Sequence, residues 1–572
     1  MIPKTLSLTS FSTFLLPHHF KTLKFCNSSR TIIICKPINS QSQQQNPPPT
    51  QTQLSVSAPE SQGTGAAAPT RGDIFLERQQ YLAASALVLE KKKKKKKKKE
   101  KINGSLKSTS TSTYSCYGCG APLQISESDA PGYVDLETYE LKKKHRQLRT
   151  VLCGRCRLLS HGHMVTAVGG NGGYAGGKQF VTAEELREKL RHLRHEKALI
   201  VKLVDIVDFN GSFLAHVRDL AGANPIILVV TKVDLLPKGT DFNCVGDWVV
   251  EATMKKKLNV LSVHMTSSKS LVGLAGVISE IQKEKKGRDV YILGAANVGK
   301  SAFINALLKM LSNKDPVAAM ARKYKPIQSA VPGTTVGPIP INAFLGGGKL
   351  YDTPGVHLHH RQAAVIHSQD LPALAPRSRL RGQSFTKQVV LDQWVSEKME
   401  FNDLTGFSIF WGGLVRIDIL KVLPETCLTF YGPKALKLHI LPTNKAEQFY
   451  KKEVGVALTP PSGEQVATWT GLETIRQLQI RFDDTQRPAC DVAISGLGWI
   501  TVEPVGLGQT VKEVGSNLVE EKDMEISLDV HVPKPVEIFV RAPLPVGKVG
   551  GEWYQYRDLT EKEEETRPKW HF

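Results

Sequence analysis

The stretch that decides the fold reads Gly294-Ala-Ala-Asn297-Val298-Gly299-Lys300-Ser301. It stands between the apolar run 289–293 and the segment 302–311, a context that predicts a strand, a phosphate-binding loop and a helix. The backbone N–H groups of such a loop, with the helix N-terminus, bind the α- and β-phosphates of a nucleotide. Lys300 would neutralise the β- and γ-oxygens, and Ser301 would bind Mg²⁺. We therefore expect an α/β nucleotide-binding domain.

Two motifs that complete a γ-phosphate site follow the loop. Asp352-Thr-Pro-Gly355 comes after a short apolar run, so Asp352 would hold Mg²⁺ through water and the Gly355 N–H would reach the γ-phosphate. Gly333-Thr334-Thr335 supplies the switch threonine. Thr335 is the expected residue that closes on Mg²⁺, with Thr334 as the alternative.

Two motifs that would read the base precede the loop. Thr231-Lys232-Val-Asp234 ends the apolar run 226–230, and Ser267-Ser268-Lys269 follows the run 260–264. The Asp234 carboxylate can accept the two N–H donors of guanine, which adenine lacks, while Lys232 packs over the base. Thr231, Ser267, Ser268 and Lys269 complete the expected base pocket. Together the two motifs favour GTP over ATP.

The order of these motifs is unusual. An ordinary GTPase runs from phosphate loop to switch threonine, DxxG, TKxD and SxK, whereas here the last two motifs come first (order G4-G5-G1-G2-G3). We predict a circularly permuted P-loop GTPase domain over residues 180–372, opened by a helix that Thr182 caps and that runs to about His195. Apolar, β-branched runs predict its strands at Ala198–Val204, Ile226–Val230, Val260–His264, Val290–Leu293 and Ile341–Phe344.

Two residues bear on the rate of hydrolysis. Val356 follows Gly355 at the position where many GTPases carry a water-orienting glutamine, so we expect slow intrinsic hydrolysis. Asn297 matches the asparagine with which potassium-activated GTPases help to bind K⁺. The alternative is an asparagine that merely stabilises the loop.

Four cysteines form a second pattern, ahead of the nucleotide motifs. Cys116-Tyr-Gly-Cys119 and Cys153-Gly-Arg-Cys156 are separated by 33 residues. Four thiolates with no open position predict a structural Zn²⁺ site in a module over residues 113–168, and His161 and His163 are not needed as ligands. A redox dithiol pair is the competing interpretation. Residues 133–149 would supply a hairpin or short helix between the pairs.

Basic residues are concentrated on this small module. Lys142-Lys-Lys-His-Arg146 and Arg149, Arg155 and Arg157 stand close together in the sequence. Such a cluster suits contacts with RNA phosphates. A plain solvated surface is the alternative.

The N-terminal segment carries most of the net charge. The chain has 572 residues and a net charge of +21, of which residues 1–115 contribute +13 with 18 Lys/Arg and five Asp/Glu. Residues 1–60 are basic, hydroxylated and free of acidic residues before Glu60, which predicts an organelle transit peptide, plastid rather than mitochondrial. Residues 61–112 would be a disordered linker with the unbroken run Lys91–Lys99. No apolar run reaches the roughly 18–20 residues of a membrane span.

Residues 373–572 carry no catalytic motif. Short β-rich runs predict a mostly β domain that interacts with RNA or the ribosome, with a purely structural domain as the alternative; they are Leu414–Leu420, Leu428–Tyr431, Gln477–Phe482, Asp491–Thr501, Ile526–Val532 and Glu537–Arg541. Gln383–Asn402 would be a variable surface loop. Tyr554-Gln-Tyr-Arg557 and Arg567-Pro-Lys-Trp-His-Phe572 mix aromatic and basic residues, which is consistent with RNA.

The cysteine pairs, the motif order and the long C-terminal region resemble the YqeH-type family of circularly permuted GTPases. Its organellar members include the plant nitric-oxide-associated proteins, and the nearest branch is expected to be that of the plant chloroplast brassinazole-insensitive-pale-green GTPases. Further carriers of the resemblance are Val204-Asp-Ile-Val-Asp-Phe-Asn-Gly-Ser212, Val331-Pro-Gly-Thr-Thr335 and Trp411-Gly-Gly-Leu-Val-Arg-Ile-Asp418. The sequence shows no haem, flavin or arginine-binding constellation for nitric oxide synthesis.

The resemblance implies a GTP-hydrolysing switch in chloroplast stromal ribosome biogenesis and rRNA processing. Its expected partners are rRNA and the pre-ribosomal small subunit, with no DNA, and its cofactors are GTP or GDP, Mg²⁺, Zn²⁺ and K⁺. The alternative is an RNA-binding scaffold whose nucleotide site is structural. An ATP-dependent metabolic enzyme is disfavoured by Thr231-Lys-Val-Asp234.

Overall fold

The computed structural model describes residues 21–24, 32–38, 114–161, 181–329, 333–394, 401–504 and 524–572. The expected transit peptide and the lysine run fall outside these residues, apart from two short strands, β1 (Lys21–Lys24) and β2 (Ile32–Ile38). In the part of the chain that is described, no helix is long and apolar enough to cross a membrane.

Residues 114–161 fold around the cysteine pairs. They contain α2 (Leu136–Lys144), the 3-10 helix η1 (Leu148–Thr150) and α3 (Gly154–Ser160). Asp135 caps α2 by accepting the N–H of Thr138, and three lysines end the helix, where positive charge is favourable. The short helix expected between the cysteine pairs is thus present.

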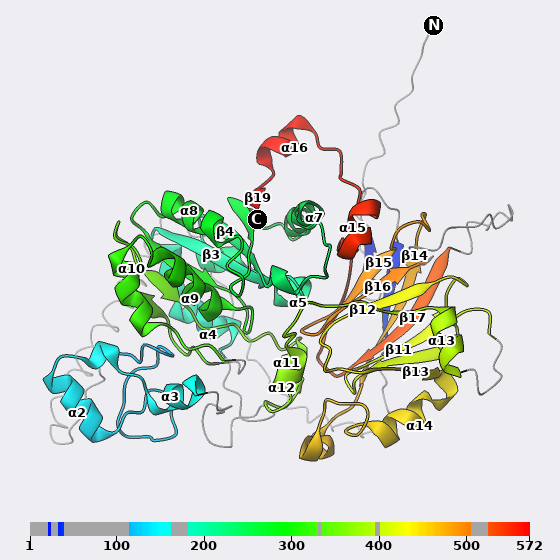
Figure 1. The fold of residues 1–572 in the computed structure, drawn as a ribbon, viewed down its shortest axis with the longest axis horizontal. Coiled ribbons are helices and arrows are strands. Elements are labelled where there is room, and N and C mark those ends of the chain that lie inside the picture. Colours follow the sequence, from blue (N-terminus) through cyan, green and yellow to red (C-terminus); the bar gives the residue numbers. More distant parts are fainter. Residues whose placement is uncertain are drawn as a thin grey trace, which may run out of the picture. The chain divides into compact units, whose positions relative to one another are not determined.

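A seven-stranded sheet forms the nucleotide-binding domain, in the order β19-β5-β4-β3-β6-β8-β7 (Figure 1). All neighbouring strands are parallel except β7 and β8. The strands are β3 (Ala198–Asp205), β4 (Ile226–Thr231), β5 (Ser262–Met265), β6 (Asp289–Leu293), β7 (Ile339–Ile341), β8 (Leu350–Asp352) and β19 (Lys569–His571).

Helices cover both faces of this sheet. Alternate residues of β3 enter two separate cores: Ile200 and Val204 pack with α7, and Leu199 and Val201 pack with α8 and α9. The helices and 3-10 helices of this part are α4 (Ala183–Lys189), η2 (Arg191–Arg194), α5 (Phe209–Ser212), α6 (Val217–Ala221), η3 (Val233–Leu235), α7 (Phe242–Lys255), α8 (Leu274–Lys285), α9 (Lys300–Leu311), α10 (Pro316–Ala321) and η4 (Arg322–Tyr324).

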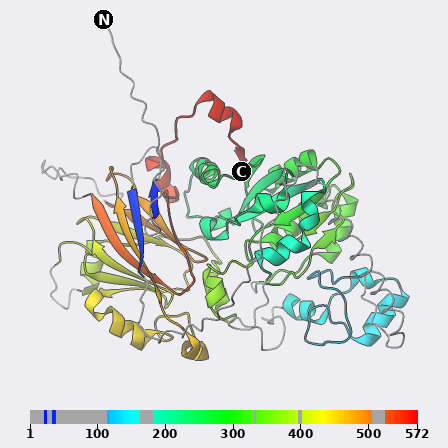
Figure 2. The same ribbon diagram turned by 180° about the vertical axis from the view of Figure 1, so that it is seen from behind.

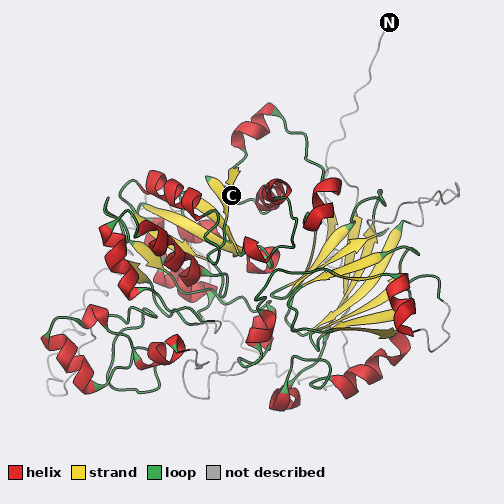
Figure 3. Ribbon diagram, viewed as in Figure 1, coloured by secondary structure: helices red, strands yellow, loops and turns green. Residues whose placement is uncertain are grey.

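A sandwich of antiparallel strands follows (Figures 1–3). One sheet has the order β1-β2-β14-β17-β11-β10-β13 and the other β18-β15-β16-β12-β9. Both contribute to one hydrophobic core. The strands are β9 (Gln383–Phe385), β10 (Phe407–Trp411), β11 (Val415–Lys421), β12 (Cys427–Tyr431), β13 (Leu438–Pro442), β14 (Thr474–Arg481), β15 (Cys490–Ile494), β16 (Gly498–Glu503), β17 (Glu525–Val532) and β18 (Ile538–Arg541).

Short helices connect these strands and the two large domains. They are α11 (Gln362–Val365), α12 (Leu371–Leu374), α13 (Lys387–Trp394), α14 (Thr443–Glu453), η6 (Gly463–Thr468), α15 (Gly547–Trp553) and α16 (Glu561–Thr566).

Several expected boundaries need correction. The run Asp491–Thr501 is two strands, β15 and β16, because the chain turns at Ser495–Leu497. The strand expected at Ile341–Phe344 lies earlier, as β7. The expected loop Gln383–Asn402 begins instead with β9 and α13, since Phe385 and Val390 are buried in the sandwich core. The helix expected to reach His195 ends at Lys189 and continues as η2.

The C-terminal tail returns to the nucleotide-binding domain. Its strand β19 pairs with β5, the ring of Trp570 lies against Gly246 of α7, and Phe572 stacks on Phe242 with ring centroids 4.0 Å apart. Arg567 pairs with Asp247 and Glu251, and Tyr554 donates to Asp247 at 2.7 Å. Tyr554, Arg567 and Trp570 therefore pack within the molecule, whereas Tyr556, Lys569 and His571 of the same motifs stay exposed.

We expect Trp570→Ala to destabilise the protein by about 2 kcal/mol. The ring is partly buried, so the effect is smaller than the about 3–5 kcal/mol typical of a fully buried tryptophan. Urea unfolding followed by circular dichroism measures the change. Lys569→Ala, on the exposed side of the same strand, is the control and should stay within about 0.5 kcal/mol of the wild type. Equal midpoints for Trp570→Ala and the wild type would show that the tail does not stabilise the domain.

Candidate functional site

The phosphate loop lies where its sequence predicted, between β6 and α9. Gly299 is the N-cap of α9, so the first helical residues are Lys300 and Ser301. The ammonium group of Lys300 is buried and donates to the carbonyls of Gly294 (3.2 Å) and Ala295 (2.8 Å). The loop therefore forms the turn that a phosphate group requires, with its lysine folded over it.

Three oxygen-bearing side chains from separate motifs converge beside this loop. The hydroxyl of Ser301 donates to Asp352 Oδ2 at 2.9 Å, and that of Thr335 donates to the same oxygen at 3.5 Å. Thr335 is thus bonded to Asp352. The second carboxylate oxygen, Oδ1, is buried and has no hydrogen-bond partner among the described residues. Hard oxygen donors with an unpartnered carboxylate oxygen fit a Mg²⁺ ion.

The electrostatics of the site favour a bound anion and cation. Burial raises the pKa of Asp352 to about 6, although the charge of Lys300 opposes the shift. Burial lowers the pKa of Lys300 to about 8, an effect that Asp352 opposes and Arg361 reinforces. A phosphate and a divalent cation would restore the charged forms of both groups.

The switch glycine touches the phosphate loop directly. A Cβ added to Gly355 would lie 2.8 Å from Ala296 Cα and 2.9 Å from Lys300 Nζ, so no larger residue fits there. The next residue, Val356, is fully buried and exchanges backbone hydrogen bonds with Gly294 (3.2 Å) and Ala296 (2.8 Å). An apolar side chain buried in this way cannot orient water.

The base-reading motifs lie side by side at the carboxyl ends of β4 and β5. Val233 N–H donates to the Thr266 carbonyl at 3.3 Å, which brings the half-buried Asp234 beside the second motif. There the Ser267 hydroxyl accepts the N–H of Lys269 at 3.2 Å, and Ser268 lies between them. The sheet thus brings the two predicted motifs together.

Two predicted residues connect the base and phosphate motifs. Thr231 is buried and donates to the carbonyls of Val204 (3.1 Å) and Val298 (2.7 Å), so it holds β4 to the phosphate loop. Lys232 donates to the Asn297 carbonyl at 3.0 Å and pairs with Asp205.

A pocket of about 250 Å³ opens between these motifs. Predicted residues lining it are Lys232, Asn297, Gly299, Lys300, Ser301, Thr334, Thr335 and Gly355. Asp234 and Ser267–Lys269 are not among the lining residues. Asp205, Asp208 and Arg361 also line the pocket, yet no role was predicted for them. Asp205 and Asp208 lie in a stretch that carried the family resemblance, whereas nothing in the sequence marks Arg361.

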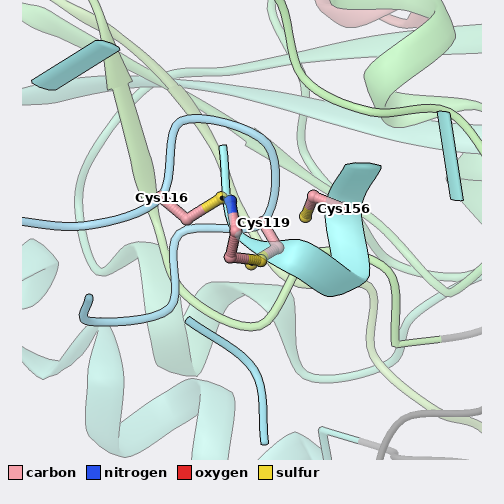
Figure 4. A group of neighbouring side chains, drawn as sticks. Cys116, Cys119 and Cys156 are labelled. Carbon is pink, nitrogen blue, oxygen red and sulfur yellow. Dashed lines mark hydrogen bonds between the residues drawn. The ribbon is translucent and has the colours of Figure 1, made fainter. Parts of the chain in front are cut away.

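The four predicted cysteines converge on one point, and Figure 4 labels three of them, Cys116, Cys119 and Cys156. Their sulfur atoms all lie within 4.8 Å of one another, and each side chain is at most 1% exposed. The Cys119 and Cys153 sulfurs are 3.9 Å apart, close to the about 3.8 Å of tetrahedral ligands at about 2.3 Å from zinc. The N–H groups of Gly118 and Cys153 point at Cys116 Sγ, at 3.4 and 3.3 Å. This donor set fits a structural zinc ion.

The cysteine module contacts the switch threonine loop. The carbonyl of Cys119 accepts the N–H groups of Val336 (2.7 Å) and Gly337 (3.1 Å). Arg155, which is buried, donates through Nη2 to the Gly333 carbonyl at 2.8 Å. The module thus holds both ends of the segment that contains Thr335.

Two family models match the chain. The model described as 50S ribosome-binding GTPase matches residues 289–406, and the model described as YqeH-like, C-terminal, matches residues 425–513. The first match begins at the strand before the phosphate loop. GTP hydrolysis follows from this domain, and GTP, GDP and Mg²⁺ are its ligands.

Three relatives define the family. NO-associated protein 1, chloroplastic/mitochondrial, of Arabidopsis thaliana is 69% identical over 514 residues, which cover 90% of this chain and 91% of that protein. YqeH of Bacillus subtilis (strain 168) is 28% identical over 431 residues, covering 75% and 98%. The GTP-binding protein Brassinazole insensitive pale green 2, chloroplastic, of Arabidopsis thaliana is 29% identical over 323 residues, covering 53% and 45%. The chain is therefore nearer to the NO-associated branch than to the pale-green branch that was expected.

The expected family itself is confirmed, together with the α/β GTPase domain, the preceding four-cysteine cluster and the mostly β C-terminal region. The chain belongs to the YqeH-type family of GTPases.

Proposed function

We propose that the protein is a GTP-dependent switch in chloroplast ribosome biogenesis, binding rRNA and the pre-ribosomal small subunit in one nucleotide state and releasing them in the other. The observation that carries this proposal is the direct bonding of Gly333, Val336 and Gly337 to the cysteine module. A change in the switch loop is thereby transmitted to a module whose α2 ends in exposed basic residues. The names of two relatives, which include "chloroplastic/mitochondrial" and "chloroplastic", support a location in the chloroplast, and the stroma is the compartment that we propose.

The proposed domain limits are those of the sequence prediction. They are 1–60 for the transit peptide, 61–112 for the linker, 113–168 for the zinc module, 180–372 for the circularly permuted GTPase domain and 373–572 for the C-terminal RNA- or ribosome-interaction domain. Support for the permutation comes from the sheet, in which β6 lies between β3, which precedes the base motifs, and β8, which carries Asp352. The GTPase family match also leaves the base-reading motifs outside its span.

Each site residue has a proposed role. Lys300 and the loop residues Gly294, Asn297, Val298 and Gly299 hold the phosphates, while Gly355 meets the terminal one. Ser301, Thr335 and Asp352 hold Mg²⁺, which when bound neutralises charge on the phosphate oxygens. Thr231, Lys232, Asp234, Ser267, Ser268 and Lys269 form the guanine site. Cys116, Cys119, Cys153 and Cys156 hold Zn²⁺.

We propose slow intrinsic hydrolysis that K⁺ and ribosomal subunits accelerate. The buried Val356 supports the slow rate because it leaves the usual water-orienting position apolar. Asn297, whose backbone has φ of +62° beside the pocket, is the proposed K⁺ ligand. Comparing turnover in K⁺ and Na⁺ buffers tests the ion, and adding small subunits tests the partner.

The experiment that tests the switch is crosslinking of the protein to chloroplast RNA in its GTP- and GDP-loaded states. A nucleotide-dependent pattern of crosslinked rRNA is expected. Identical patterns, together with no GTP turnover in K⁺ buffer with small subunits, would favour the alternative of an RNA-binding scaffold with a structural nucleotide site.

Asp234→Asn is expected to weaken GTP binding by about tenfold to a hundredfold. The carboxylate would accept two N–H groups of guanine, and a charged hydrogen bond contributes about 1.5–3 kcal/mol. An asparagine side chain presents one acceptor and one donor instead, so xanthosine triphosphate, which has a carbonyl at the 2-position, should bind better than GTP. Competition binding with a fluorescent nucleotide measures both affinities.

Asp241→Asn is the matched control for this variant. Asp241 caps α7 in the same region, and asparagine is an equally good N-cap. Its nucleotide preference should remain that of the wild type. An unchanged preference in Asp234→Asn would remove Asp234 from the base site.

A further inference from the structure

Arg361 lies against the nucleotide pocket although it belongs to none of the nucleotide motifs. Its side chain lines the pocket and the residue is 8% exposed. Nε donates to Asp208 Oδ2 at 2.8 Å, and Nη1 donates to the carbonyl of Ala296 at 2.6 Å. Because Ala296 belongs to the phosphate loop, one guanidinium group ties that loop to the segment after β3.

The contact with Ala296 places Arg361 at the γ-phosphate end of the pocket. Ala296 N–H donates to the Val356 carbonyl at 2.8 Å, and Ala296 Cα is the nearest atom to a Cβ built on Gly355. Arg361 therefore meets the phosphate loop where the loop touches the switch glycine. Arg361 and Lys300 both line this pocket, so the two positive charges face the same space.

The C-terminal sandwich holds this arginine in place. The turn between β15 and β16 donates the Gly496 N–H to Asp208, and its Ser495 carbonyl accepts the N–H of Gln362 at 2.9 Å. Glu537, which immediately precedes β18, donates its N–H to the His360 carbonyl at 3.0 Å. Both members of the buried ion pair are thus fixed by a domain other than the one that binds nucleotide.

We propose that Arg361 is a positioning residue for GTP hydrolysis: held by Asp208 and by the Ser495–Gly496 turn, it fixes the phosphate loop at Ala296 and presents a positive charge to the γ-phosphate. In the reaction a water oxygen bonds to the γ-phosphorus, and the bond from that phosphorus to the β–γ bridging oxygen breaks. The bond's electron pair stays with GDP, and both protons of the water end on the released phosphate, which leaves as dihydrogen phosphate. A fixed cation stabilises the negative charge that gathers on these oxygens.

This role rests on GTP hydrolysis and not on the ribosomal partner. The C-terminal domain would thereby influence the rate of hydrolysis, because a displacement of the Ser495–Gly496 turn would also displace Arg361. Since Val356 cannot orient water, the fixed charge of Arg361 would contribute to the rate in place of a water-orienting side chain.

Arg361→Ala is expected to lower kcat by about a hundredfold while KM changes by less than about threefold. Arg361→Lys keeps the positive charge but lacks the planar, forked guanidinium that bonds Asp208 and the Ala296 carbonyl at the same time. Its kcat should therefore lie between those of Arg361→Ala and the wild type. Direct binding gives a readout independent of turnover: the ratio of GTP to GDP affinity should fall, by no more than about the threefold allowed for KM, because only GTP carries the γ-phosphate. Arg416→Ala removes an ion pair of similar length, 2.7 Å, within the sandwich and should leave kcat and the ratio unchanged.

A variant in the C-terminal sandwich tests whether that domain influences hydrolysis through Arg361. Gly496 has φ of +80°, and an added Cβ would lie 3.0 Å from the Gln362 nitrogen, so Gly496→Ala should displace the turn and lower kcat. Gly471→Ala is the matched control, since Gly471 has φ of +85° but open space around it. The effects of Gly496→Ala and Arg361→Ala should be less than additive.

Wild-type kcat and nucleotide ratio in Arg361→Ala would overturn the inference. Equal losses of GTP and GDP affinity, with unchanged kcat, would show a purely structural arginine and would also overturn it. A wild-type protein without turnover would instead refute the hydrolysis on which the inference rests.

Discussion

Asp352→Asn is expected to reduce kcat by at least about a hundredfold while the protein stays folded. The carboxylate accepts the hydroxyls of Ser301 and Thr335 and keeps a second buried oxygen for the cation. An amide is neutral and is a poor substitute among hard oxygen ligands, so Mg²⁺ and the charge it neutralises are lost. Steady-state hydrolysis at saturating GTP measures the rate.

Thermal unfolding separates this loss of ligand from a loss of fold. Burial disfavours the charged form of Asp352, so the neutral asparagine should leave the nucleotide-free protein at least as stable as the wild type. The stabilisation by GTP and Mg²⁺, about 2.7 kcal/mol at about 100 times Kd for the wild type, should decrease. Asp289→Asn, at the end of β6 away from the phosphate loop, is the control. It should retain the turnover of the wild type and its stabilisation by GTP and Mg²⁺. Wild-type turnover in Asp352→Asn would exclude the carboxylate from the cation site.

Local sequence patterns predicted the elements that surround the proposed nucleotide site. Gly294–Ser301 lies between a strand and a helix because apolar periodicity and glycine spacing determine both the elements and the loop between them. The base-reading motifs lie at the carboxyl ends of the neighbouring parallel strands β4 and β5, again because apolar runs determine where these strands form. The cysteine spacing likewise predicted a cluster whose sulfurs lie within 4.8 Å.

Contacts between distant segments could not be predicted in this way. Arg361 stands in a histidine-rich segment with no motif, and only the fold brings it to Ala296 and Asp208. The tail around Trp570 suggested RNA because aromatic and basic residues fit a binding surface as well as a core, and only the pairing of β19 with β5 shows that Trp570 itself packs inside. The turn that divides Asp491–Thr501 was missed because the mostly apolar residues on both sides of Ser495–Leu497 read as one continuous strand.

Cys153→Ser, or removal of zinc by a chelator, is expected to unfold residues 114–161 and to weaken GTP binding by about tenfold to a hundredfold. Structural zinc contributes about 10–16 kcal/mol, which exceeds the stability of a small domain. Without the module the switch loop loses the Cys119 carbonyl and the Arg155 guanidinium, each hydrogen bond contributing about 0.5–1.5 kcal/mol. Fluorescent-nucleotide titration and hydrogen exchange of residues 333–337 measure the two effects.

Cys244→Ser is the matched control, because Cys244 is a buried cysteine of α7 outside the cluster. It should keep both zinc content and GTP affinity, and adding zinc back to the chelated wild type should restore binding. Coupling between two sites is reciprocal at equilibrium, so saturating GTP should also tighten zinc binding, measured by competition with the chelator, by about the same factor as zinc tightens GTP. If zinc-free protein bound GTP as tightly as zinc-loaded protein, with equal exchange protection at 333–337, the bonds from Cys119 and Arg155 would have no part in the switch.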